Sequence, residues 1–126
     1  MKAAQEAWRL SLKRVLKALG SLGLSQTEAQ IYVFLEKNGA QKNSDIAKAL
    51  KIRTNELTIS LKNLQDKRVV KASAQETVEF SAVPFEKAMD LLIEVKKEQA
   101  QNLQERKMEL LSSWQNLKEK KSENNW

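Results

Sequence analysis

The sequence predicts a mainly α-helical fold, in which a three-helix core and a two-stranded β-hairpin lie between an N-terminal helix and a long C-terminal helix. Three observations support this class. Apolar residues recur at helical spacing over most of the chain, and the pattern changes to alternation only over residues 69–82. The 126 residues also include one Pro and three Gly, which is few for an all-β protein.

The first predicted helix covers residues 4–19. One of its faces is apolar and the rest is mostly basic, which is typical of a helix that packs on one side only. We interpret Gly20 as its stop signal. The apolar face consists of Trp8, Leu12, Val15, Leu16 and Leu19.

The second predicted helix begins with a capping box. The Ser25 side chain can accept a hydrogen bond from the Glu28 amide, and the Glu28 side chain can accept one from the Ser25 amide. The helix runs to about residue 37 and is apolar almost all round, so we expect it to be buried on more than one side. Asn38 and Gly39 are expected to end it.

Two short helices joined by a turn are predicted over residues 44–68. Ser44 is the expected N-cap of a helix over residues 45–50, and Thr54 is the expected N-cap of a helix that runs to about residue 67. This last helix has a buried leucine face and an opposite, mostly polar face that is free to enter a groove. The buried face contains Leu57, Leu61 and Leu64, and the opposite face contains Asn55, Ile59, Lys62 and Asp66, with Thr58 and Asn63 at its flanks.

A small β-hairpin follows these helices. Its strands are expected over residues 69–72 and 77–82, where apolar and polar residues alternate, and residues 73–76 must turn between them. One face of the second strand is predicted to contain Val78, Phe80 and Ala82.

A long helix completes the predicted architecture. Pro84 is its expected first residue, no breaker appears before about residue 122, and residues 123–126 are expected to fray. One seam alternates spacings of four and three residues, as in a coiled coil. The seam consists of Met89, Ile93, Lys96, Ala100, Leu103, Lys107, Leu110, Trp114 and Leu117.

Composition excludes several classes of function. The chain has no Cys and no His, which removes disulfides, thiolate metal sites and the commonest general base. No group of Asp and Glu has the spacing of a carboxylate metal loop, so we expect no metal, no cofactor and no enzymatic activity. No apolar run approaches the roughly 20 residues of a membrane helix, and the N-terminus lacks the apolar core of a signal peptide. We therefore expect a cytoplasmic protein without a membrane partner.

The charge of the chain is basic and unevenly distributed. With 22 basic and 16 acidic residues, the net charge is +6. Residues 1–24 contribute five basic and one acidic residue, residues 25–84 contribute nine and seven, and residues 85–126 contribute eight of each. This excess favours a polyanionic partner such as double-stranded DNA; the alternative is a basic surface with no partner.

The order of the predicted elements is that of a winged helix-turn-helix domain, because a three-helix unit ends in a hairpin. The residues also resemble the DNA-binding domain of the TrmB family of archaeal transcription regulators, although MarR-like regulators share much of the pattern. The resemblance covers residues 23–92 and has no counterpart of the sugar-binding domain of larger TrmB members, so sugar sensing is not carried over from the family. The matching residues are Gly23-Leu24-Ser25, Glu28-Ala29, Tyr32, Gly39, Ser44-Asp45-Ile46-Ala47, Leu61, Leu64, Phe80 and Val83-Pro84.

The resemblance implies that residues 54–67 form the recognition helix, which enters the major groove of DNA. In that groove an Asn can pair with an adenine edge, Thr and Ile can meet a thymine methyl group, and Lys can reach guanine or phosphate. Flanking residues would contact phosphates and position the domain. The expected groove contacts are Thr54, Asn55, Thr58, Ile59 and Lys62, and the expected phosphate contacts are Lys42, Ser44, Lys51 and Arg53.

Two features weaken the expected DNA surface. The wing has a single basic residue, Lys71, which completes the expected DNA-binding set, and its tip over residues 74–76 ends in Glu76. We therefore expect little insertion of the wing into the minor groove. Glu56 lies next to the groove face and would repel phosphate unless it meets a cytosine amine.

The apolar stripe on the long helix predicts self-association, because a monomer would expose it. A two-fold homodimer would present two recognition helices to successive major grooves; alternatively, the apolar stripes fold back on their own domain. We therefore divide the chain into a supporting helix over residues 1–22, a DNA-binding domain over residues 23–83 and a dimerisation helix over residues 84–126. The expected dimerisation residues are Trp8, Leu12, Val15, Leu16, Ile93, Ala100, Leu103, Leu110, Trp114 and Leu117.

Two other functions stay open on the sequence. The first is a winged-helix module that binds an unidentified protein partner, which the weak wing and the neutral C-terminal third would allow. The second is a chromatin-like protein that binds DNA with little sequence preference. Steep loss of DNA affinity with salt would separate a DNA-binding protein from a protein adaptor.

Overall fold

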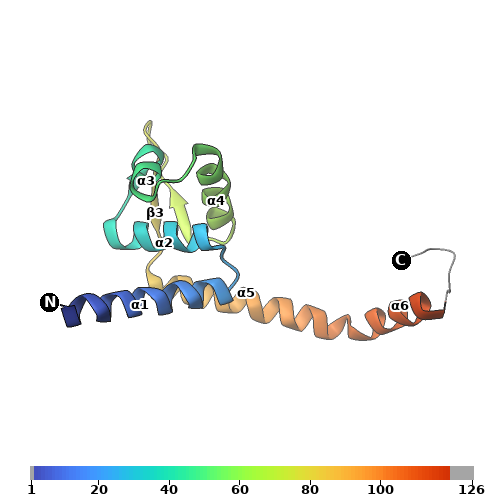
Figure 1. Cartoon of the computed structure of the whole chain (residues 1–126). Helices are drawn as coiled ribbons and strands as arrows, with labels where there is room; N and C mark the ends of the chain where they lie inside the picture. Colours follow the sequence, from blue (N-terminus) through green and yellow to red (C-terminus); the bar gives the residue numbers. More distant parts are fainter. Residues whose placement is uncertain (1, 120–126) are drawn as a thin grey trace. The chain divides into compact units, whose positions relative to one another are not determined.

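The computed structural model describes residues 2–119 and has the predicted winged helix-turn-helix fold, mainly helical with a small sheet (Figure 1). The chain divides after Ile93 into two compact units. The part of the expected C-terminal helix beyond residue 119, with residues 123–126 that were expected to fray, lies outside the described residues. In chain order the elements are α1 (Lys2–Ser21), α2 (Gln26–Asn38), β1 (Gln41–Lys42), α3 (Asn43–Leu50), α4 (Thr54–Asp66), β2 (Val70–Ala72), β3 (Glu79–Ala82), α5 (Phe85–Glu105) and α6 (Lys107–Glu119).

The sheet of the first unit has three antiparallel strands in the order β1-β3-β2. In the hairpin, Val70 lies opposite Ala82 and Ala72 lies opposite Phe80. On the other edge of β3, Gln41 of β1 lies opposite Phe80. Strand β1 was not predicted, because two residues are too few to show the alternation that identifies a strand.

The predicted hairpin is confirmed, with strands shorter than expected. Two hydrogen bonds between Ser73 and Glu79 close the loop between the hairpin strands. The Ser73 amide donates to the Glu79 carbonyl at 2.8 Å, and the Ser73 hydroxyl accepts from the Glu79 amide at 3.0 Å. The prediction that Val78 shares the inward face is wrong. Val78 precedes β3 and is exposed, because this loop, and not the strand, contains it.

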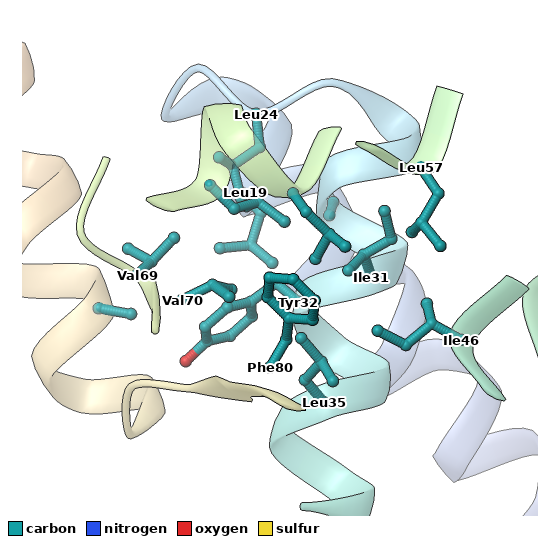
Figure 2. Packing of buried hydrophobic residues seen from close by; sticks show 14 of the residues in the cluster. Leu19, Leu24, Ile31, Tyr32, Leu35, Ile46, Leu57, Val69, Val70 and Phe80 are labelled. Atoms are coloured by element: carbon teal, nitrogen blue, oxygen red, sulfur yellow. The ribbon is translucent and has the colours of Figure 1, made fainter. Parts of the chain in front are cut away.

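Helix α2 lies at the centre of the core and contacts α1, α3, α4 and β3. Its fully buried residues share one broad face, and Val33 and Phe34 outside that face are partly buried against the core, as predicted for a helix covered on more than one side. Figure 2 shows several of them among the leucine, isoleucine and valine side chains of the surrounding elements. The buried apolar residues of α2 are Ala29, Ile31, Tyr32 and Leu35.

The ends of α2 are those that the sequence predicts. The Glu28 amide donates to the Ser25 hydroxyl, and the Ser25 amide donates to Glu28 Oε1, both at 3.1 Å. Gly39 follows the helix with a φ of 81°, a conformation that favours glycine.

The prediction that Gly20 ends α1 is wrong, because the helix continues to Ser21. Gly23 instead has a positive φ of 104°. The Gly23 amide donates to the Gly20 carbonyl at 3.0 Å, and the Leu24 amide donates to the Leu19 carbonyl at 3.1 Å. This pair of bonds forms a Schellman motif, in which the residues corresponding to Leu19 and Leu24 commonly make an apolar contact. Both leucines belong to the buried core.

The start of α5 is tied to α2. Pro84 is the N-cap and not the first helical residue, because its carbonyl accepts the first helical bond from the Ala88 amide. The Phe85 amide donates to Glu36 Oε2 at 2.6 Å. The residue that precedes Pro84 is also held, since the Tyr32 hydroxyl donates to the Val83 carbonyl.

The expected uninterrupted C-terminal helix is two helices, with a turn at Arg106 between α5 and α6. Helical bonds continue on both sides, since the Arg106 amide donates to the Asn102 carbonyl and the Arg106 carbonyl accepts from the Leu110 amide. Neither Pro nor Gly causes the break. Residues 93–119 are all exposed, so within the described chain no side-chain packing holds this stretch straight.

Within residues 2–119, no helix combines the length and the apolarity that crossing a membrane requires. In the same residues, no three acidic side chains gather as metal ligands would.

We expect the core to lose stability as the pH rises above about 10. Burial, and to a smaller extent the charge of Glu36, raises the pKa of Tyr32 well above its ordinary value of 10. The unfolded chain therefore releases this proton at a lower pH than the folded chain. The stabilisation is complete below pH 10 and is lost as the pH rises through the folded pKa.

Urea unfolding on both sides of this pH measures the effect, and Tyr32→Phe is the control because it should flatten the alkaline fall. Tyr32 is the single tyrosine of the chain, so ultraviolet absorbance of tyrosinate reports it alone. Ionisation of the folded protein at the ordinary tyrosine pKa would contradict the buried setting.

Candidate nucleic-acid interface

Helix α4 has one buried face and one exposed face. Leu57, Leu61 and Leu64 are at most 2% exposed and pack into the core, and Ser60 is buried beside them. Ile59, on the opposite face, is 62% exposed. An apolar side chain is therefore offered to solvent at the centre of a polar surface. The exposed residues of this face are Thr54, Asn55, Thr58, Ile59, Lys62 and Asp66.

The N-cap residues of α3 and α4 differ from the predicted ones. Ser44 is not the N-cap of α3, because β1 ends at Lys42 and the helix begins at the next residue, which puts Ser44 in the first turn. Thr54 is not the N-cap of α4, because the Arg53 carbonyl accepts the first helical bond from the Leu57 amide at 2.9 Å. Neither N-cap position has a side-chain hydrogen bond.

The turn between α3 and α4 presents two cations. Lys51 has a left-handed backbone with a φ of 55°, and Arg53 is extended with a ψ of 147°. Ile52 lies between them and packs against the core. Because Ile52 faces inward, Lys51 and Arg53 on either side of it are exposed.

The expected phosphate contacts are all exposed, and their cations are free of ion pairs. Within residues 2–119 the ion pairs join Lys67 to Glu28 and Arg106 to Glu109. The basic side chains on this part of the surface are thus not neutralised by a neighbouring carboxylate. They are Lys42, Lys51, Arg53, Lys62 and Lys71, and Ser44 is exposed as well.

Glu56 was expected to repel phosphate at this surface. Its carboxylate is instead hydrogen-bonded to a side chain of α2. The Thr27 hydroxyl of α2 donates to Glu56 Oε1 at 3.1 Å. Asn63, expected at the flank of the groove face, is also engaged with α2, since its Nδ2 donates to Glu28 Oε2 at 2.9 Å. The sequence predicted Glu28 as part of a capping box. It gave no sign of the contact between Glu28 and Asn63, because the two residues lie 35 positions apart.

The dimerisation residues that were expected on α1 divide between core and surface. Val15 and Leu16 of α1 pack against the core. Leu12 is half-buried, and Trp8 is 54% exposed at the rim of a pocket of about 230 Å³ that Leu12, Val15, Tyr32, Val33 and Phe85 help to line. The Lys37 ammonium lies 4.5 Å from the centre of the Trp8 ring.

The second unit is exposed along its whole described length. The expected seam residues from Ile93, the last residue of the first unit, to Leu117 show large exposed fractions, from 37% at Ile93 to 68% at Leu117. Met108 and Leu111 add exposed apolar surface at 74% and 51%. The remaining expected dimerisation residues, all exposed, are Ala100, Leu103, Leu110 and Trp114.

Solved structures share this fold. TrmBL2, an archaeal chromatin protein described as showing a novel mode of DNA binding, is 19% identical with a TM-score of 0.70; the match covers 84% of this chain and 41% of that protein. A possible transcriptional regulator from Methanosarcina mazei Go1 is 16% identical with a TM-score of 0.58, over 77% of this chain and 86% of the other. A transcriptional regulator from Thermotoga maritima is 14% identical with a TM-score of 0.56, over 93% and 90%.

At these sequence identities, the similarity shows a shared fold. No curated protein matches the sequence. A family model described as "Sugar-specific transcriptional regulator TrmB" matches residues 19–86, more than half of the chain, and this family consists of regulators and not of enzymes. The chain therefore belongs to the TrmB family of winged helix-turn-helix DNA-binding transcriptional regulators.

Proposed function

We propose that this regulator binds double-stranded DNA as a homodimer, with α4 in the major groove. The observation that carries the proposal is the exposed face of α4, where Ile59 is 62% exposed between Asn55 and Lys62. Burying an exposed isoleucine against a thymine methyl group would be favourable. A regulator of this kind acts where its DNA is, and we infer a cytoplasmic location.

Two side chains of this face have the chemistry to read base edges. The Asn55 amide can pair with adenine, and the Lys62 ammonium can reach guanine or a phosphate. Thr58 is less free, because its hydroxyl donates to the Thr54 carbonyl at 2.9 Å, although its methyl group can still meet thymine. We therefore assign Asn55 and Lys62 the larger share of base reading.

Affinity in this proposal comes mainly from phosphate contacts around α4. Lys42, Lys51 and Arg53 are exposed and form no ion pair within residues 2–119, and Ser44 lies in the first turn of α3, where helix amides favour anions. Lys71 is the single cation of the wing, so the wing adds little to binding in the minor groove, where Arg and Lys are the usual contacts. Such contacts give affinity without sequence selection.

The proposed homodimer forms through the second unit. Every residue over 93–119 is exposed, and the stretches on either side of the break at Arg106, residues 93–105 and 107–119, have the length at which isolated helices are marginal in water. Pairing the seam from Ile93 to Leu117 with a second copy would bury its apolar side chains. We infer a dimerisation region over residues 84–126, a DNA-binding domain over residues 23–83 and a supporting helix over residues 1–22. In that helix Trp8 and Leu12 remain available to a partner, whereas Val15 and Leu16 pack on the core.

A second candidate is DNA binding with little sequence preference. It is favoured by the small number of base-reading groups on the expected groove face of α4, which has one amide, Asn55, and one ammonium, Lys62. The two candidates differ in competition experiments. A selective regulator keeps a preferred duplex when random DNA is added, and a non-selective protein is competed away in proportion to the DNA added.

We predict that Asn55→Ala and Lys62→Ala each weaken DNA binding. Loss of a base contact costs about 1–3 kcal/mol, or roughly 5- to 150-fold in affinity on a preferred site. If Lys62 contacts a phosphate, its loss also lowers the slope of affinity against salt by about one. Fluorescence anisotropy with a labelled duplex at several salt concentrations measures both effects.

Lys13→Ala is the matched control, because it removes an equal charge from the exposed face of α1. It should leave the salt slope unchanged. If both α4 variants bind like the wild type, α4 is not the recognition helix.

We predict that Leu103→Asp with Leu110→Asp converts a dimer into a monomer. A charge in the seam would be buried without a partner on association. Light scattering should give twice 14.4 kDa for the wild-type chain and 14.4 kDa for the variant. Asn102→Asp with Gln101→Glu adds the same charge outside the seam and should leave the mass doubled; a wild-type mass of 14.4 kDa would refute the homodimer.

A further inference from the structure

We propose that the first turn of α2 sets the rotation of α4 about its own axis, and that Thr27 and Glu28 are positioning residues for DNA recognition. The proposal rests on the proposed function of α4. Neither residue belongs to the face that would touch DNA. Both lie in the first turn of α2, the neighbour of α4 in the core (Figure 1).

Glu28 contacts three other residues through one carboxylate, and the residue is 5% exposed. Its Oε1 accepts from the Ser25 amide at 3.1 Å and lies 3.5 Å from Lys67 Nζ. Its Oε2 accepts from Asn63 Nδ2 at 2.9 Å. The cap of α2 is therefore also the attachment point for the C-terminal end of α4.

Thr27 holds the other end of α4. Its hydroxyl donates to Glu56 Oε1 at 3.1 Å, and Glu56 is in the first turn of that helix. Glu56, Asn63 and Lys67 are spaced by seven and four residues, so they form one stripe along α4. With a rise of about 1.5 Å per residue, the stripe extends for about 16 Å.

The apolar contacts of α4 alone would not fix its rotation as sharply. Leu57, Leu61 and Leu64 are buried, and the hydrophobic effect that buries them is non-directional. Hydrogen bonds weaken steeply when their angle changes. A polar stripe attached at both ends therefore selects one rotation, and with it the direction in which Asn55 and Lys62 point.

The same bonds also control charge near the proposed interface. The Thr27 bond holds the Glu56 carboxylate at α2, where it is kept from a phosphate. Glu28 also forms an ion pair with the Lys67 ammonium. Lys67 is half-buried and is therefore not counted among the free cations.

The test uses the sign of the effect that Glu28→Gln has on DNA affinity. This variant removes a negative charge and releases Lys67, so electrostatics alone would strengthen binding to DNA. Loss of positioning predicts the opposite, a fall of about three- to tenfold. Glu86→Gln, at an exposed position of α5, makes the same charge change and should bind DNA at least as well as the wild type.

A second pair of variants leaves the charge unchanged. Thr27→Val keeps the shape but removes the hydroxyl donor, and Thr27→Ser keeps the donor. We expect weaker DNA binding from Thr27→Val and wild-type binding from Thr27→Ser. This pair decides the question if Glu28→Gln fails to fold, which circular dichroism detects.

Amide hydrogen exchange separates this proposal from the proposed function. Glu28→Gln should speed exchange over residues 54–66 more than Glu86→Gln does, whether or not DNA binds. If the wild-type chain ignores DNA, the proposed function fails and exchange alone decides the positioning role. The positioning role is overturned if exchange in α4 is unchanged in Glu28→Gln, or if folded Glu28→Gln and Thr27→Val bind DNA as tightly as their controls.

Discussion

The burial of α2 between four other elements is the constraint on which the rest of the first unit depends. Because this helix is covered on several sides, its polar side chains can be used as fixed attachment points. Tyr32 holds the Val83 carbonyl after β3, and Glu36 holds the Phe85 amide at the start of α5. Glu28 holds α4. One helix thus positions both the candidate recognition surface and the point where the long C-terminal region begins.

The charge pattern differs between the part of the chain that carries the candidate DNA surface and the part that we propose for dimerisation. The unpaired cations and the exposed face of α4 belong to the first unit, where residues 25–84 carry nine basic and seven acidic residues. Residues 85–126 carry eight of each, so their net charge is zero. A neutral, apolar helix surface favours contact with another protein surface, and a basic one favours phosphate. This division supports the proposed homodimer that presents two copies of α4.

Much of the fold could be predicted from local patterns, because the patterns have local causes. The capping box at Ser25 and the leucine face of α4 follow from spacing alone, and both are present. The exact helix starts could not be predicted in the same way. Ser44 has the chemistry of an N-cap, but β1 pairs with β3, a strand far along the chain, and this pairing decides where α3 begins.

The candidate site shows the same limit. Periodicity selected Asn55, Ile59 and Lys62 as an exposed face, and all three are exposed. It could not show that Glu56 and Asn63 are engaged by α2, because those contacts join residues 29 and 35 positions apart. Nor did it show the break at Arg106, since no residue there disfavours a helix.

Nuclear magnetic resonance of the backbone amides during titration with a DNA duplex would show which residues meet DNA. If α4 is the recognition helix, shifts concentrate over residues 54–62 and at Lys42, Lys51 and Arg53, with residues 74–76 of the wing tip little changed. Shifts confined to α1 or to residues 94–119, with α4 unperturbed at saturation, would contradict this role of α4.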